Sequence, residues 1–139
     1  MKPELLPSAR QTLSISPHFW PASAVVWTAC VLGMALSPMK DIDWYTATIN
    51  DKTVHGFAFA VGAVVWALTL RGLRLNIAIP IIFGGMISLA LGGLIELLQK
   101  FVPGRSAESG DFYADILGVL FAVGLLLLIS HRNQKNTDR

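Results

Sequence analysis

Charge is scarce in this sequence. Only 14% of its 139 residues are Asp, Glu, Lys or Arg, against roughly 25% in a soluble globular domain. Hydrophobic residues make up 53% of the chain, and the mean hydropathy is +0.56. A water-soluble domain of this size needs more polar surface than so few charges provide. The composition therefore excludes intrinsic disorder and predicts a chain that is solvated by lipid.

Cysteine and clustered basic residues are also lacking. The single cysteine, Cys30, excludes an internal disulfide and a cysteine cage for a metal. The net charge is only +2, and the basic residues are spread over the chain ends and short connections. Nucleic-acid binding requires a concentrated basic surface, so we expect no nucleic-acid partner.

What the sequence does contain is a set of long apolar runs with few or no charges. Each approaches the ~20 residues that cross ~30 Å of hydrocarbon, and none has the polar stripe of a helix that faces water. We therefore predict an all-α fold, a bundle of four transmembrane helices. The runs are Trp20 to Leu36, Thr53 to Leu70, Leu75 to Ile95 and Phe112 to Ser130.

These runs predict three segments: an N-terminal segment over 1–18, a membrane domain over 19–130 and a polar tail over 131–139. A cleaved signal peptide is the competing interpretation of the first run. It is disfavoured because the apolar stretch is long for such a peptide and Pro38 follows the small residues Ala35 and Ser37.

The orientation in the membrane follows from the positive charges near the helix ends. More basic residues lie in the N-terminal segment, the second connection and the tail than in the first and third connections. Both termini are therefore predicted to be cytoplasmic. The two groups are Lys2, Arg10, Arg71, Arg74, Arg132, Lys135 and Arg139 against Lys40, Lys52, Lys100 and Arg105.

A face of small residues on the third run leads to a carboxylate. Small residues let helices approach closely in lipid, so we expect this face, and Glu96 with it, to point into the bundle. Gln99 is three residues further on and shares the face. The face consists of Pro80, Gly84, Ser88, Gly92 and Glu96, at intervals of four.

The second and fourth runs begin with ionisable residues at the same membrane face at which the third run ends. By the rise per residue, His55, Glu96 and Asp115 each lie roughly 4 to 6 Å inside their helix ends. Charge there has to be paired, neutralised or solvated. We call the whole set the polar layer: Asp51, Lys52, His55, Glu96, Asp111 and Asp115.

Two cations, Lys52 and Arg105, and the neutral Gln99 are the expected partners of these acids. If every group ionises, negative charge is in excess, and a proton, a metal or a cationic ligand would remove it. The N-termini of two helices favour a ligand of the opposite charge, because their positive ends suit an anion such as phosphate or carboxylate. The sign of the ligand's charge stays open.

Several motifs follow one another at fixed spacings: Asp51-Lys52-x-x-His55-x-x-x-Phe59, Glu96-x-x-Gln99 and Pro103-Gly104-Arg105, with Asp111 six residues after the arginine. This pattern resembles a known family, the VanZ-like bacterial membrane proteins, over roughly residues 50–118. One position departs from the family pattern, which usually closes with Asn-x-x-Gly. Here the corresponding residues begin with Asp115, so a charge is added and an amide donor is removed.

The family takes its name from an accessory protein of teicoplanin resistance. The resemblance implies a multi-pass protein of the bacterial cytoplasmic membrane. The first functional hypothesis is a binding or modifying protein for an envelope lipid, a lipid-linked cell-wall precursor or a glycopeptide. The ligand-binding candidates are Asp51, Lys52, Gln99, Arg105 and Asp115.

An intramembrane hydrolase or transferase is the second hypothesis. His55 would be the general base, oriented by Asp51 or Asp111, and Glu96 the acid. No nucleophilic Ser or Cys stands out, and no cofactor is indicated. A divalent metal on His55, Glu96 and Asp115 would be chemically reasonable. The third hypothesis is a structural subunit, and a homo-oligomer is compatible with the glycine-rich helices.

Overall fold

The computed structural model describes residues 16–37, 51–73, 75–105 and 108–137, and all regular structure in these ranges is helical. Four of the helices are long and apolar enough to cross a membrane, as the sequence predicted. The N-terminal segment 1–15 and the connection 38–50 lie outside the described residues, and with them Lys2, Arg10 and Lys40, on which the predicted orientation depends. The helices are α1 (Phe19–Leu36), α3 (Asp51–Leu70), the short 3-10 helix η1 (Arg71–Leu73), α4 (Ala78–Gln99) and α5 (Ser109–Thr137).

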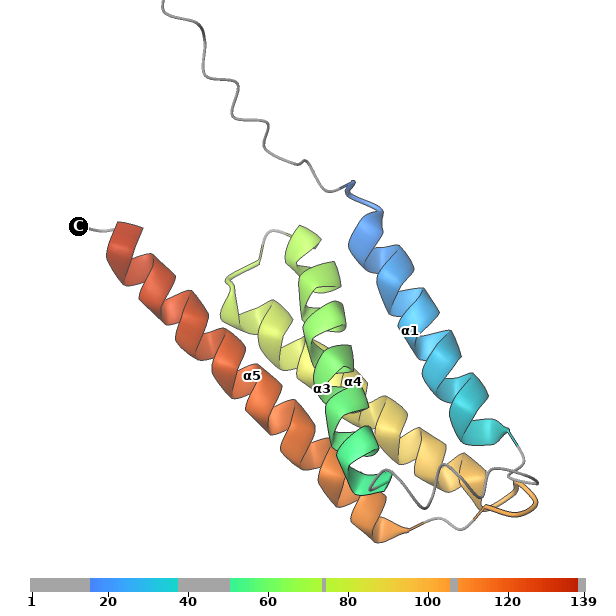
Figure 1. The fold of residues 1–139 in the computed structure, drawn as a ribbon. Helices are drawn as coiled ribbons and strands as arrows, with labels where there is room; N and C mark the ends of the chain where they lie inside the picture. The colour runs from blue at the N-terminus through green and yellow to red at the C-terminus, as the bar shows by residue number, and fades with distance from the viewer. Residues whose placement is uncertain (1–15, 38–50, 74, 106–107, 138–139) are drawn as a thin grey trace, which may run out of the picture.

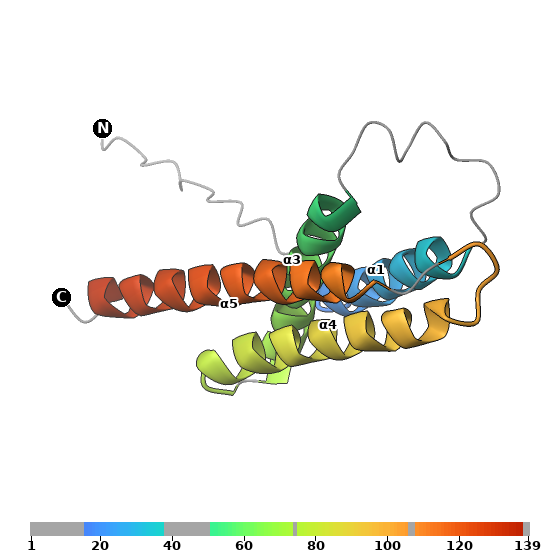
Figure 2. The same cartoon turned by 90° about the horizontal axis from the view of Figure 1, so that it is seen from below.

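Helix α3 is the centre of the bundle. It lies between α1 and α5 and packs extensively on both α4 and α5, whereas α1 packs mainly on α3 (Figure 1). Helix α1 is peripheral, and Ala24 is its only buried residue. The view from below shows α3 crossing the other helices steeply (Figure 2). Any site inside the bundle therefore involves α3.

The helices end close to where the hydrophobic pattern predicted, with one difference. Helix α5 continues through Ser130 to Thr137, so the first residues of the predicted polar tail are helical. The residues that follow Ser130 include neither Gly nor Pro, and His, Arg, Gln and Lys are compatible with a helix. Loss of hydrophobicity thus marks the end of the apolar span rather than the end of the helix.

The core is small and lies where α3, α4 and α5 meet. It consists of Phe59, Ala63, Ile95, Val119 and Ala122, and all five side chains are buried. Many large apolar side chains elsewhere are exposed, which is expected of a chain whose surroundings are lipid rather than water.

Glycine brings the backbones of α3 and α5 into contact. A Cβ built on Gly118 would overlap the carbonyl oxygen of Gly56. Between α3 and α4, a Cβ on Gly84 would overlap the backbone nitrogen of Ala67. The predicted small-residue face of α4 is indeed buried at Pro80, Gly84, Ser88 and Gly92. Close packing of small residues therefore sets the spacing of the three core helices.

Candidate functional site

Helices α3 and α5 begin at the same end of the bundle, so the residues of their first turns meet. Asp51 and Asp111 lie in the first turns, and His55 and Asp115 follow one turn deeper on the same two helices. The predicted polar layer is therefore assembled mainly from the N-terminal turns of two helices that run side by side.

The central contact of the polar layer joins His55 to Asp115. The His55 Nδ1 atom lies 3.1 Å from Asp115 Oδ1, which is hydrogen-bond distance. The Asp115 side chain is only 1% exposed and the His55 side chain 15%. The imidazole also stacks on Phe59, with ring centroids 6.2 Å apart. The sequence suggested Asp51 or Asp111 as the group that orients His55, whereas in the structure the hydrogen-bonded carboxylate is Asp115.

Asp115 has a second oxygen that is not paired. Its Oδ2 atom is buried and has no hydrogen-bond partner among the described residues. The same atom would lie 2.7 Å from a Cβ on Gly92 of α4. Only a glycine at this position of α4 leaves room for the carboxylate.

Glu96 lies one helical turn beyond Gly92 on α4, on the face that meets Asp115. Its Oε1 atom is buried and has no hydrogen-bond partner in the described part of the chain. The structure thus places Glu96 on the face of α4 that meets Asp115 at Gly92, and its buried oxygen agrees with the expectation that Glu96 points into the bundle.

Lys52 provides positive charge at the rim of the polar layer. Its Nζ atom lies 3.6 Å from Glu108 Oε2 and 3.9 Å from Asp111 Oδ1. The Lys52 side chain is half-exposed, whereas the Asp111 side chain is 8% exposed. Asp111 Oδ1 is buried and makes no hydrogen bond within the described ranges. Glu108 was missed, because an acid before the fourth run is indistinguishable in sequence from a solvated loop residue.

Gln99 and Arg105 make their contacts with a different helix. The Gln99 side chain donates to the carbonyl of Ala35 at 3.3 Å, and Arg105 donates to the carbonyls of Met34 at 2.8 Å and Ser37 at 3.3 Å. These carbonyls belong to the C-terminal turn of α1, which has no later helical residue to satisfy them. Both side chains, predicted to bind ligand, thus cap α1.

Three members of the polar layer are also close enough to share a cation. Asp51, His55 and Asp111 can each offer a ligand atom, and these atoms lie within 4.8 Å of one another. The set differs from the His55, Glu96 and Asp115 set considered from the sequence. Because Asp115 already holds Nδ1 of the imidazole, Nε2 is the nitrogen left for a metal or a proton.

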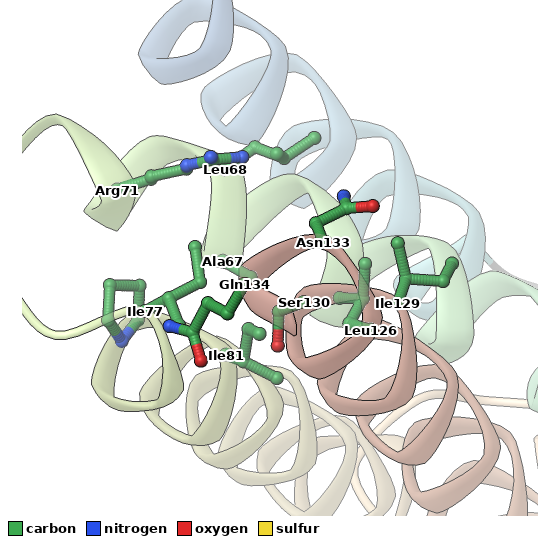
Figure 3. Close-up of a pocket in the computed structure, with 11 residues that line it drawn as sticks. Ala67, Leu68, Arg71, Ile77, Ile81, Leu126, Ile129, Ser130, Asn133 and Gln134 are labelled. Atoms are coloured by element: carbon green, nitrogen blue, oxygen red, sulfur yellow. The ribbon is translucent and has the colours of Figure 1, made fainter. Parts of the chain in front are cut away.

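A cavity of about 650 Å³ opens at the other end of the bundle (Figure 3). It is bordered by the end of α3, the start of α4 and the C-terminal half of α5, and none of the eight predicted site residues lines it. Sequence reasoning missed this cavity, because three of its four polar lining residues, Arg71, Asn133 and Gln134, lie in a connection and a predicted tail, and Ser130 ends the predicted fourth run.

No family model matches the chain, and comparison with curated proteins and with solved structures also gives no match. The resemblance to VanZ-like proteins therefore stays a prediction from the motifs.

Proposed function

We propose that this protein is a VanZ-like, multi-pass protein of the bacterial cytoplasmic membrane that binds or modifies an envelope amphiphile. The substrate class is an envelope lipid, a lipid-linked cell-wall precursor or a glycopeptide, and the physiological outcome is teicoplanin-type resistance. The polar layer faces outward in this proposal. The observation that carries the proposal is the hydrogen-bonded pair of His55 and the buried Asp115, next to carboxylate oxygens that make no hydrogen bond with any described residue.

The hydrogen bond between the buried Asp115 and one ring nitrogen of His55 determines what the other ring nitrogen can do. When Nδ1–H donates to Asp115, Nε2 carries the lone pair and can accept a proton from a hydroxyl group or from water. Nε2 has no hydrogen-bond partner among the described residues. Burial of Asp115 and stacking on Phe59 hold the imidazole in one orientation. Glu96, close by, is the candidate to return the proton.

The charges around this pair fit a headgroup that carries both acidic and hydroxyl or amino groups. Lys52 is half-exposed and lies at the N-terminal turns of α3 and α5, where the helix dipoles also favour an anion. Asp51 and Asp111 offer acceptors for hydroxyl or amino groups. The exposed apolar side chains of the bundle give the hydrocarbon part of an amphiphile a surface to lie on.

The test compares His55→Asn and Asp115→Ala with His131→Asn, which changes an exposed histidine of α5 outside the polar layer. Wild-type protein made in a teicoplanin-susceptible bacterium should raise the minimum inhibitory concentration of teicoplanin. His55→Asn and Asp115→Ala should abolish that rise, and any turnover of an undecaprenyl-linked precursor should fall about 100-fold or more in His55→Asn, which lacks the base. His131→Asn should behave as wild type. Equal resistance in all four strains, at equal protein levels in the membrane, would refute the proposal.

A metal-dependent version is the second candidate, and one observation favours it. The atoms of Asp51, His55 and Asp111 that lie within 4.8 Å of one another include two carboxylates and an imidazole, a donor set that suits a divalent transition metal. Asp115 would hydrogen-bond to Nδ1, the ring nitrogen that does not bind the metal, as carboxylates commonly do for metal-bound histidines. Elemental analysis of protein purified without chelators decides between the two. One equivalent of metal that is lost in Asp111→Asn supports this candidate, and its absence after incubation with Zn²⁺ or Mn²⁺ eliminates it.

A further inference from the structure

The cavity at the end opposite the polar layer has its own chemistry. It is open to the surface and encloses about 650 Å³ between three helices. Figure 3 shows that its labelled residues come from α3 with η1, from α4 and from α5, and that they surround one space. The proposed function leaves this cavity without a role.

The lining changes from apolar to polar along the helix axes. On α5, Leu126 lies deeper in the span, and Asn133 and Gln134 lie about two turns, roughly 12 Å, further out. On α3, Ala67 lies one turn before Arg71, which begins η1 at the end of the span. The polar rim is therefore at the level where a lipid bilayer places its headgroups, and the apolar floor is at the level of the acyl chains.

The charge of the cavity has one sign. Among the described residues, Arg71 is the one charged residue that lines it, and no carboxylate does. All carboxylates of the described residues, namely Asp51, Glu96, Glu108, Asp111 and Asp115, lie at the opposite end of the bundle. Arg71 forms no ion pair within the part of the chain that the structure describes. Its guanidinium, which suits phosphate geometrically, thus faces no competing acid among the described residues.

We infer that this cavity binds an anionic phospholipid, with the phosphate at Arg71 and the amides of Asn133 and Gln134 and with part of an acyl chain on the apolar floor. Basic pockets between membrane helices are suited to such headgroups. The inference does not depend on the chemistry of the polar layer, because the two sites share no residue.

The test measures lipid binding to the purified full chain in detergent by native mass spectrometry. The probes are dioleoylphosphatidylglycerol, dioleoylphosphatidylcholine and glycerol 3-phosphate. The wild type should retain phosphatidylglycerol in preference to phosphatidylcholine and should not bind glycerol 3-phosphate measurably. Arg71→Ala should weaken phosphatidylglycerol binding about 10-fold, the loss expected for one charge-assisted contact. Arg71→Lys should retain most of the affinity.

The matched control is Arg132→Ala, which removes the same charge from an exposed position of α5 that does not line the cavity. It should bind phosphatidylglycerol as the wild type does. Arg71 is itself exposed, so its variants should fold, and unchanged thermal unfolding of the lipid-free proteins verifies this. Equal loss in Arg71→Ala and Arg132→Ala, or equal binding of the two phospholipids, would overturn the inference. Binding of glycerol 3-phosphate as strong as that of the lipid would overturn the part assigned to the acyl chain.

Discussion

The two ends of the bundle differ in the sign and the depth of their charges. At one end lie all the described carboxylates, with Lys52, Lys100 and Arg105 as the cations, and at the other lie Arg71, Arg132 and Lys135 with no described acid. Helices α3 and α5 both start at the acidic end and finish at the basic end. This is the arrangement that the helix dipole favours, acids in the first turn and bases in the last.

The helix dipole alone therefore explains the positions of Asp51 and Asp111 at one end and of Lys135 at the other, and no function has to be invoked for them. It does not account for His55 and Asp115, which are one turn further in, nor for Glu96. Glu96 lies near the C-terminus of α4, where the dipole disfavours a carboxylate. The comparison thus separates residues that stabilise helix ends from three groups that do not, the buried Asp115 and the partly buried His55 and Glu96, and these three define the candidate site.

The largest expected effect tests whether the acidic end depends on direct contact between α3 and α5. In Gly118→Ala, the new methyl group meets the Gly56 carbonyl, so the helices have to separate. The free energy of unfolding should fall by about 1 to 3 kcal/mol, as in other overpacked cores. The measurement is thermal unfolding in detergent, followed by the loss of monodisperse protein.

Gly124→Ala is the control for this substitution, because a Cβ at Gly124 has nothing within 4 Å. Gly124 lies on the same helix, closer to the end of the bundle at which the cavity opens. The substitution should leave the unfolding temperature unchanged or slightly higher. If the two variants unfold at the same temperature, the close approach of α3 and α5 is not what holds the acidic end together.

An intermediate effect is expected from Gln99→Ala, which tests the capping of α1. The Gln99 side chain is 4% exposed and donates to the Ala35 carbonyl. Removing it leaves that carbonyl without this donor and should lower the free energy of unfolding by about 1 kcal/mol. The proposed teicoplanin resistance should survive in proportion to the amount of folded protein. Complete loss of resistance at a normal unfolding temperature would instead support the predicted role of Gln99 in ligand binding.

The sequence was sufficient to predict the four spans, because long charge-free runs in a chain of this composition are rarely anything but membrane helices. It also predicted that Glu96 lies inside the bundle, since Pro80, Gly84, Ser88 and Gly92 repeat at the helical interval. It could not predict that His55 pairs with Asp115 rather than with Asp111. That choice depends on the relative depth of α3 and α5, which the contact of Gly56 with Gly118 fixes and which no local pattern encodes.

The roles of Gln99 and Arg105 were beyond the sequence for a related reason. A polar residue at the end of a span can bind a ligand or cap another helix, and the two uses require the same donors. Only the position of α1, whose last carbonyls lie next to both side chains, decides between them. Helix α1 has no charged residue and only one buried residue, so its sequence gives little indication of where it packs.

The smallest effect on stability is expected from Glu96→Gln, and it distinguishes function from structure at the acidic end. The Glu96 carboxylate has a buried oxygen that makes no hydrogen bond with the described residues, and it lies near the negative end of its helix. Replacing such a group with a neutral one should raise the free energy of unfolding by less than about 1 kcal/mol, because desolvation of a charge is no longer required. Glu108→Gln, at a side chain 58% exposed, should be neutral in both stability and resistance. If Glu96→Gln is at least as stable as the wild type and loses teicoplanin resistance, the carboxylate serves the site. A lower unfolding temperature with resistance retained would show that Glu96 only holds the helices in register, and the three-residue site would then reduce to the His55–Asp115 pair.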